Sequence, residues 1–291
     1  MPLICQTPSG WLQAALICAA LVIRGGYILS TADELRRDPD HYAEIARHLH
    51  DRQAFALGDP DGQPTAYRPP LYPLVLSVFE GLGKPLLARA VLHVALGVAT
   101  VWLAWRLALR WGLSSTMALA AAALVMVDPI LLNQSSQVMT ETLAAFLAAC
   151  ALLALARAAR EDSLWAASLS GGVLGLCVLC RPTFLVWFAA VAVAWPLIAS
   201  RPRRAARTVA LLMAAAMSVA PWMIRNQVIF GRPIVTTTHG GYTLLLANNP
   251  GFYEYLRHAK WGSVWDGAAL HAEFEARFEP AAGELVRDRV A

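Results

Sequence analysis

Acidic side chains are concentrated in one segment of the sequence. Eight of the twenty Asp and Glu residues lie between residues 30 and 68, directly after the first apolar run. Two of them, Asp38 and Asp40, flank Pro39 and precede the aromatic Tyr42. Such a carboxylate can take a proton from an attacking hydroxyl or amine. An Asp ahead of a helix can also cap its free N–H groups, which stabilises the helix by about 1 kcal/mol. Both roles stay open for Asp38.

Four arginines lie near the ends of apolar runs, where they could meet a phosphate. They are Arg24, Arg68, Arg89 and Arg181. The planar guanidinium donates two parallel hydrogen bonds, which suits a phosphate group. Each side chain could equally be an anchor whose apolar stem lies along lipid while the charge reaches the headgroups. The pattern therefore predicts candidate phosphate ligands and leaves the anchoring role open for each.

A further acid, Glu141, stands at the start of an apolar run. An ionised group deep in a bilayer costs about 2.5 to 3.5 kcal/mol, so an acid at this place has either a function or a partner. Both readings stay open for Glu141.

The elements that position these residues are membrane helices. The chain has 291 residues, of which 57% are hydrophobic and only 15% charged, and its mean hydropathy is +0.48. Soluble domains carry about 25% charged residues, so we expect an all-α polytopic membrane protein. Scanning for apolar stretches of about 20 residues predicts about seven spans, at 11–29, 85–109, 116–132, 138–156, 164–181, 183–200 and 206–223.

Arginines in the short loops predict the orientation of these spans. Arg106, Arg110, Arg157, Arg160 and a cluster between residues 201 and 207 fall on one side, and the hairpins on the other side hold only Arg181. Because basic residues favour the cytoplasmic side, the N-terminus is expected in the cytoplasm of the cell membrane. The loop 30–68 and the tail 224–291 are then extracytoplasmic, outside a membrane domain of residues 1–223.

The loop 30–68 should contain an amphipathic helix. Apolar residues recur at Tyr42, Ile45, Ala46 and Leu49, the spacing of one helix face. Asp38-Pro39 is expected to mark its start, because Asp is a favoured cap and Pro is tolerated at the first position. Inside a later span, Gly171 to Gly175 offers the small-residue spacing of a close helix contact.

Several kinds of chemistry lack their motifs. There is no nucleophile elbow for a Ser-His-Asp hydrolase and no phosphate loop for a nucleotide. Basic residues lie in short clusters between apolar runs, which speaks against a nucleic-acid partner and for membrane lipid. No spacing of ligands compels a metal, so we assign no cofactor and no metal site; the acids of the first loop leave a divalent cation open.

Four segments together resemble a known class of enzyme. Asp38 to Arg47 (DPDHYAEIAR), Tyr67 to Pro73 (YRPPLYP), Pro221 to Asn226 (PWMIRN) and His239 to Pro250 (HGGYTLLLANNP) resemble bacterial membrane glycosyltransferases of the GT-C class. Within that class the chain is most similar to the group of protein O-mannosyltransferases and the lipid A aminoarabinose transferase, a family 39-like group.

The resemblance implies transfer of a sugar from a polyprenyl-phosphate donor to a glycan, lipid or protein acceptor at the outer face of the cytoplasmic membrane. It implies that a carboxylate four residues before an aromatic residue does the chemistry, a spacing that Asp38 and Tyr42 match. Glu141 corresponds to the second acid of the family. Arg24, Arg68, Arg89 and Arg181 are then expected to bind donor phosphate, and Tyr42 and Tyr67 to position the loop or the acceptor.

The sequence departs from the family in two ways. Relatives have an acid directly after the key Asp, whereas here Pro39 intervenes, so either Asp38 or Asp40 could be the working carboxylate. Relatives are also longer, which predicts a missing C-terminal region.

Two alternatives to the enzyme stay open: a transporter or flippase of lipid-linked saccharides, or an inactive truncated membrane protein. Charges gathered at one membrane face, rather than at its middle, favour the enzyme.

Overall fold

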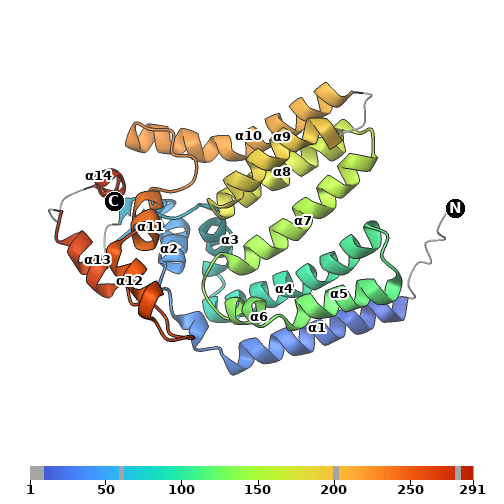
Figure 1. Ribbon diagram of the computed structural model, residues 1–291, viewed down its shortest axis with the longest axis horizontal. Coiled ribbons are helices and arrows are strands. Elements are labelled where there is room, and N and C mark those ends of the chain that lie inside the picture. Colours follow the sequence, from blue (N-terminus) through green and yellow to red (C-terminus); the bar gives the residue numbers. More distant parts are fainter. Residues whose placement is uncertain (1–9, 59–61, 199–202, 279–282, 291) are drawn as a thin grey trace.

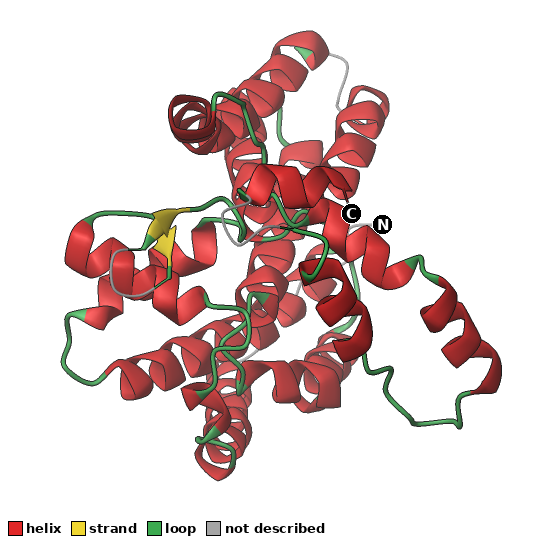
Figure 2. Cartoon of the chain, turned by 90° about the vertical axis from the view of Figure 1, so that its left-hand side faces the viewer, coloured by secondary structure: helices red, strands yellow, loops and turns green. Residues whose placement is uncertain are grey.

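The computed structural model describes residues 10–58, 62–198, 203–278 and 283–290. Long helices pack side by side into a bundle, and short helices cover one of its ends (Figure 1). The described part is almost wholly helical, with a single pair of two-residue strands (Figure 2). The bundle helices are α1 (Gly10–Ser30), α4 (Pro85–Arg110), α5 (Ser115–Val127), α6 (Pro129–Ser135), α7 (Glu141–Arg160), α8 (Leu164–Cys180), α9 (Phe184–Ile198) and α10 (Arg204–Phe230).

Each of the seven predicted spans is largely helical in its described residues, which confirms an all-α polytopic membrane protein. Four helices, α1, α4, α7 and α10, are long and apolar enough to cross a membrane. The expected single span 116–132 is instead the pair α5 and α6, bent by 50°. Pro129 begins α6, and the Asp128 carboxylate accepts from the amide of Leu131 at 2.8 Å, so a new helix starts where the first ends.

The other two predicted spans are shorter. Helices α8 and α9 have 17 and 15 described residues, below the roughly 20 that a bilayer requires. The structure thus offers four spans, or five with the bent pair, within the described ranges. Seven crossings stay a prediction. Helix α10 also runs to Phe230, past the expected end of the membrane domain at residue 223.

Glycines bring α8 against α10, as the small-residue spacing predicted. A Cβ placed on Gly171 would lie 2.0 Å from the carbonyl oxygen of Leu211, and one on Gly175 would lie 2.9 Å from that of Ala215. Neither site has room for a side chain, since real Cβ atoms do not approach so closely. The two backbones therefore pack directly on each other, a contact that only glycine allows.

Replacing one of these glycines should loosen the bundle. We expect Gly171→Ala to lower stability by about 1 to 3 kcal/mol, the usual cost of forcing a methyl group into a packed interface. Thermal unfolding of the purified protein in detergent measures it. Gly172→Ala is a matched control, because its Cβ would meet only Ser218 Oγ at 3.9 Å. Equal melting temperatures for the two variants would contradict the packing.

The two long polar segments come together at one end of the bundle. The first holds η1 (Glu34–Arg36), α2 (Tyr42–Arg52), β1 (Ala56–Leu57), β2 (Gln63–Pro64) and α3 (Leu71–Glu80). The tail holds α11 (Gly240–Ala247), α12 (Pro250–His258), α13 (Ala268–Glu275) and α14 (Glu284–Val290). Both sit at the left of Figure 1. Arg225 of α10 ties the first segment to the bundle by donating to the carbonyls of Thr65 and Phe55. The Glu284 carboxylate of α14 joins the tail to the first segment by accepting from Thr65 Oγ1.

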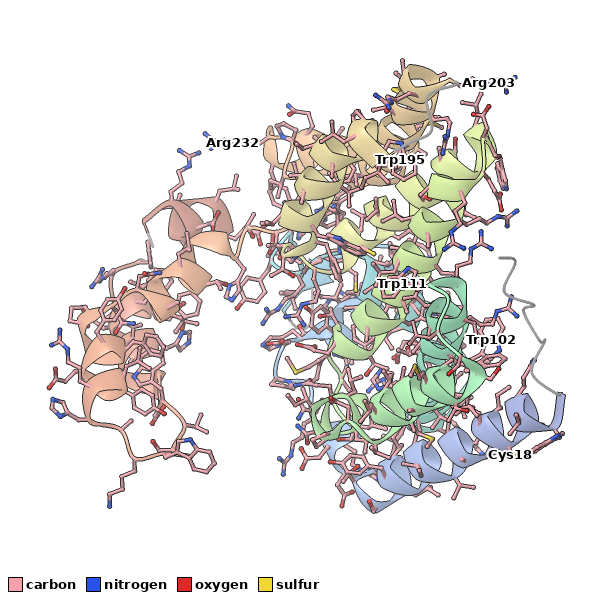
Figure 3. The ribbon with its side chains drawn as sticks, turned by 45° about the vertical axis from the view of Figure 1, so that its right-hand side comes forward. Cys18, Trp102, Trp111, Trp195, Arg203 and Arg232 are labelled. Carbon is pink, nitrogen blue, oxygen red and sulfur yellow. The ribbon has the colours of Figure 1, made fainter. Side chains whose placement is uncertain are left out.

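The opposite end carries the basic clusters. Arg110 at the end of α4 lies 3.6 Å from Glu161, and buried Arg207 of α10 donates to the carbonyl of Ala158. Arg203 and Arg232, which flank α10, mark the two ends of the bundle in Figure 3. The described parts of the loop 30–68 and of the tail thus lie at the end of the bundle opposite these basic residues. Which side faces the cytoplasm stays a prediction.

Candidate active site

A cavity of ≈ 300 Å³ opens where the first loop and the tail meet the bundle. We call it the central cavity. It brings together six of the nine predicted site residues, which come from four separate segments: Asp40, Tyr42, Tyr67, Arg68, Glu141 and Arg181. Residues 139–141 and 180–183 line it from the bundle, and five residues of the tail complete it: Thr237, His239, Gly240, Thr243 and Leu244. The structure therefore gathers these six residues around one cavity at one end of the bundle.

Arg68 is the most enclosed cation of the cavity. Its guanidinium donates to the carboxylate of Asp40 at 2.5 Å and to the Asp40 carbonyl at 3.0 Å, and its side chain is only 14% exposed. It also lies over the rings of Tyr67 and Tyr42, at 4.6 and 5.6 Å from their centroids. These rings attract a cation through their negative faces. Arg68 is thus held in place on three sides and is well positioned to meet an anion.

A second ion pair lies in the same cavity. Arg181, just after α8, pairs with Glu141 at the start of α7 and donates to Thr140 Oγ1 at 3.3 Å. The other carboxylate oxygen of Glu141 is buried and has no hydrogen-bond partner among the described residues. Buried polar atoms of this kind are uncommon in folded proteins and call for an explanation. The cavity therefore holds two arginine–carboxylate pairs.

Tyr42 is fixed by contacts below the cavity. Its ring packs edge-on against Tyr72 of α3, with centroids 5.3 Å apart. Tyr72 donates to His93 Nε2 at 2.8 Å, because the other ring nitrogen of His93 donates to the Ser135 carbonyl at 2.8 Å. This chain of bonds ties α3, α4 and α6 to the loop. Burial raises the pKa of Tyr42, and it also raises the pKa of Tyr67, which is the less buried of the two. Both hydroxyls therefore stay protonated.

The structure separates Asp38 from Asp40. Helix α2 begins at Tyr42, later than expected, because His41 adopts the left-handed conformation with φ 61° and closes a turn at Asp38. Asp38 still acts as a cap, since its Oδ2 accepts from the amide of Glu44 at 2.9 Å. Its Oδ1 is buried without a partner among the described residues. Of the two acids, Asp40 alone is among the residues that line the central cavity.

Two predicted arginines lie elsewhere. Arg24 is buried in the bundle and donates to the Val125 carbonyl at 2.9 Å, in a space left by Gly97. Arg89 pairs with Glu80 of α3 at 2.7 Å, with 13% of its side chain exposed. Neither lines the central cavity. The structure therefore does not bring Arg24 and Arg89 together with Arg68, and a role for them in binding donor phosphate stays a prediction.

The tail adds residues that were not among the predicted site residues. His239 stacks edge-on against Tyr67, with centroids 4.4 Å apart, and Thr237 donates to the Tyr67 carbonyl. Both line the cavity. The motif from His239 to Pro250 was the available signal, but nothing in the sequence placed it over Tyr67. The amide of Thr238 donates to the Ala66 carbonyl at 2.9 Å and makes that connection.

Acid should weaken the tail contact at His239. Burial and the charge of Arg68 lower the pKa of His239 to about 4. Because an unfolded histidine titrates near 6.5, the unfolded state binds the extra proton first, and the stability due to neutral His239 is lost as pH falls from 6.5 to 4. Melting temperatures across this range should fall more steeply for wild type than for His239→Gln. Parallel curves would contradict a neutral, half-buried His239.

Within the described ranges, no group of three or more His, Cys, Asp or Glu side chains is arranged to hold a metal ion. The acids of the cavity are instead paired with arginines. The chemistry open to the central cavity is thus anion binding by Arg68 and Arg181 next to carboxylates that can accept a proton.

A comparison with protein families decides the classification. Residues 67–224, more than half of the chain, match the family described as dolichyl-phosphate-mannose-protein mannosyltransferase. The chain belongs to this family. It is therefore a membrane glycosyltransferase of the mannosyltransferase type, as the resemblance implied. Comparisons with curated proteins and with solved structures gave no match. The matched segment includes Tyr67, Arg68, Glu141 and Arg181 of the central cavity and ends in α10.

Proposed function

We propose that this mannosyltransferase-family protein moves a sugar from a polyprenyl-phosphate donor to an acceptor at the outer face of the cytoplasmic membrane, and that transfer takes place in the central cavity. The observation that carries the proposal is the pairing of Arg68 with Asp40 and of Arg181 with Glu141 around one cavity. A lipid-linked donor needs cations for its phosphate and a carboxylate for the acceptor, and both are present.

The arginines supply charge where charge develops. The phosphate that links a prenyl chain to a sugar carries one negative charge, and it gains a second when the bond to the sugar breaks. Arg68 and Arg181 would stabilise this second charge, and fixed cations in an enclosed site are effective because they need no reorganisation. Apart from Asp40 and Glu141, the phosphate is the natural partner for their guanidinium groups.

Asp40 is the carboxylate that we assign to the acceptor. It lines the cavity, and its side chain is 24% exposed. Phosphate bound to Arg68 would loosen the pair with Asp40 and leave the carboxylate able to take the proton of the acceptor hydroxyl or amine. Asp38 keeps the capping role that its bond to the amide of Glu44 indicates. Glu141 holds Arg181, and Tyr42 and Tyr67 hold Arg68.

The cavity lies at the end of the bundle opposite the basic clusters, and this place supports an extracytoplasmic site. A lipid-linked donor fits such a site, because its prenyl chain stays in the bilayer while its phosphate reaches the cavity. The mannose-type family name agrees with a hexose as the donated sugar.

Transfer of label tests the proposal. Purified protein in lipid nanodiscs would receive polyprenyl-phosphate hexoses with a labelled sugar, together with a membrane extract as the source of acceptor. We expect label to move from the donor lipid into an acceptor fraction and polyprenyl phosphate to be released in equal amount. Movement of intact donor across a vesicle bilayer without any release of polyprenyl phosphate would instead support a flippase and overturn the proposal.

A further inference from the structure

A second cavity of ≈ 260 Å³ adjoins the central cavity on the side of the tail. We call it the tail cavity. Tyr67, whose ring lies under Arg68, and His239, which packs against Tyr67, line both cavities and form a wall between them. Its remaining walls come from Thr238 and from side chains of α11, α13 and α14: Tyr242, His271, Phe274, Glu275, Glu284, Arg287 and Asp288. A molecule bound there would lie next to the proposed reaction site.

Aromatic rings form one face of the tail cavity. The ring of Tyr242 lies 4.9 Å from that of Phe274 and 5.2 Å from that of His239. The Tyr242 hydroxyl is bonded to His271 Nδ1 at 2.9 Å, which holds the ring in place. Ring faces carry partial negative charge and attract weakly positive C–H groups, such as those on one face of a pyranose chair. This surface suits the C–H face of a sugar.

Polar groups surround the rings. Arg287 pairs with Glu275 at 2.8 Å, Asp288 accepts from the amide of Gly241 at 2.7 Å, and Glu284 accepts from Thr65 Oγ1 at 2.6 Å. The Thr238 hydroxyl and Arg287 Nε are buried without partners in the described part of the chain. An unpartnered buried polar group costs about 1 to 3 kcal/mol, a cost that a ligand with several hydroxyl groups would remove.

Charge distinguishes the two cavities. The tail cavity has three carboxylates, Glu275, Glu284 and Asp288, and one cation, Arg287. Phosphate is repelled by such a surplus of acid, whereas hydroxyl groups can donate to carboxylates and accept from Thr238 and Arg287. The donor phosphate therefore belongs with Arg68 and Arg181, and the tail cavity is left for the other substrate.

We propose that the tail cavity binds a sugar ring of the acceptor, so that this protein extends a glycan or a glycolipid. The sugar ring would lie on Tyr242 and Phe274. A hydroxyl group of the same acceptor would reach past Tyr67 toward Asp40. This inference rests on the proposed function in one respect, that the bound sugar belongs to the acceptor. The binding of a sugar in the tail cavity can be measured without any transfer.

Binding of simple glycosides tests the inference. Saturation-transfer NMR on the whole protein in nanodiscs would use the methyl glycosides of mannose, glucose and galactose as probes. We expect at least one to bind. Its affinity should fall about fivefold in Thr238→Val, which keeps the shape and removes one hydrogen bond worth about 1 kcal/mol, and should be lost in Tyr242→Ala. Tyr242→Phe keeps the ring and should retain most of the binding, which also shows that the tail is folded.

Two further variants separate this inference from the proposed function. Leu256→Ala, at an exposed position of α12 outside both cavities, should leave glycoside binding unchanged. Arg68→Gln should also leave it unchanged while it reduces transfer. If transfer fails while glycoside binding is intact, the proposed function is overturned, but the inference that the tail cavity binds a sugar is not. The inference itself is overturned if no probe binds, if Tyr242→Ala has no effect, or if a Ser/Thr peptide displaces the probe, which would indicate a protein acceptor.

Discussion

Asp40→Asn is expected to reduce sugar transfer by about 10²- to 10⁴-fold, the range that a general base contributes. Asparagine keeps the shape of the side chain and can still accept from Arg68, but it cannot take a proton at neutral pH. The loss should therefore appear in kcat, with donor affinity changed much less. Rates of release of polyprenyl phosphate by purified protein in nanodiscs, at saturating donor, measure it.

Asp38→Asn is the matched control for this prediction. Its amide oxygen can still accept from the amide of Glu44, so the cap on α2 is kept. We expect transfer within about threefold of wild type, because asparagine keeps the hydrogen bond from the Glu44 amide that the structure shows for Asp38. The family spacing points to Asp38 instead. Loss of transfer in Asp38→Asn with activity retained in Asp40→Asn would show that Asp38 is the working carboxylate and that Asp40 only holds Arg68.

Arg68→Gln should have an effect of similar size through the phosphate. Removal of one fixed group that stabilises developing charge costs about 10²- to 10³-fold in kcat. Lysine should not restore the full rate, because it lacks the flat fork that binds two oxygens and stacks on Tyr67 and Tyr42. The measurement is kcat and KM with the same donor for Arg68→Gln, Arg68→Lys and wild type.

Arg37→Gln controls for the loss of a positive charge from the same loop. Arg37 is 73% exposed and pairs only with Glu34 among the interactions described, so its replacement should change transfer little. Equal losses in Arg37→Gln and Arg68→Gln would mean that the loop acts through its overall charge. Unchanged kcat in Arg68→Gln, in a variant that melts like wild type, would contradict phosphate binding in the central cavity.

The helices could be predicted from sequence because apolar runs have a length that only membrane spans require. The amphipathic stripe of α2 was predicted correctly from Tyr42 to Leu49 for a similar reason. Its start was placed too early. The turn through left-handed His41 lets Asp38 cap the helix from outside, and no propensity rule signals a cap at that distance.

The site was harder to predict than the fold. Arg24 and Arg68 both lie near the ends of apolar runs. In the structure, however, Arg24 donates to the Val125 carbonyl in the space beside Gly97, whereas Arg68 lines the central cavity. The difference depends on which helix packs against each side chain, which a one-dimensional pattern does not contain. Likewise, the position of His239 over Tyr67 depends on bonds between distant segments, from Thr238 to Ala66 and from Thr237 to Tyr67.

The most direct test of the account is where the donor binds. A polyprenyl-phosphate hexose with a photoreactive diazirine on its sugar would be irradiated with the active protein in nanodiscs, and the labelled peptides would be identified by mass spectrometry. We predict labels on the segments that line the central cavity, residues 67–69, 139–141 and 180–183, and their loss when unlabelled donor is added. Labels confined to other segments of an active protein would contradict transfer in the central cavity.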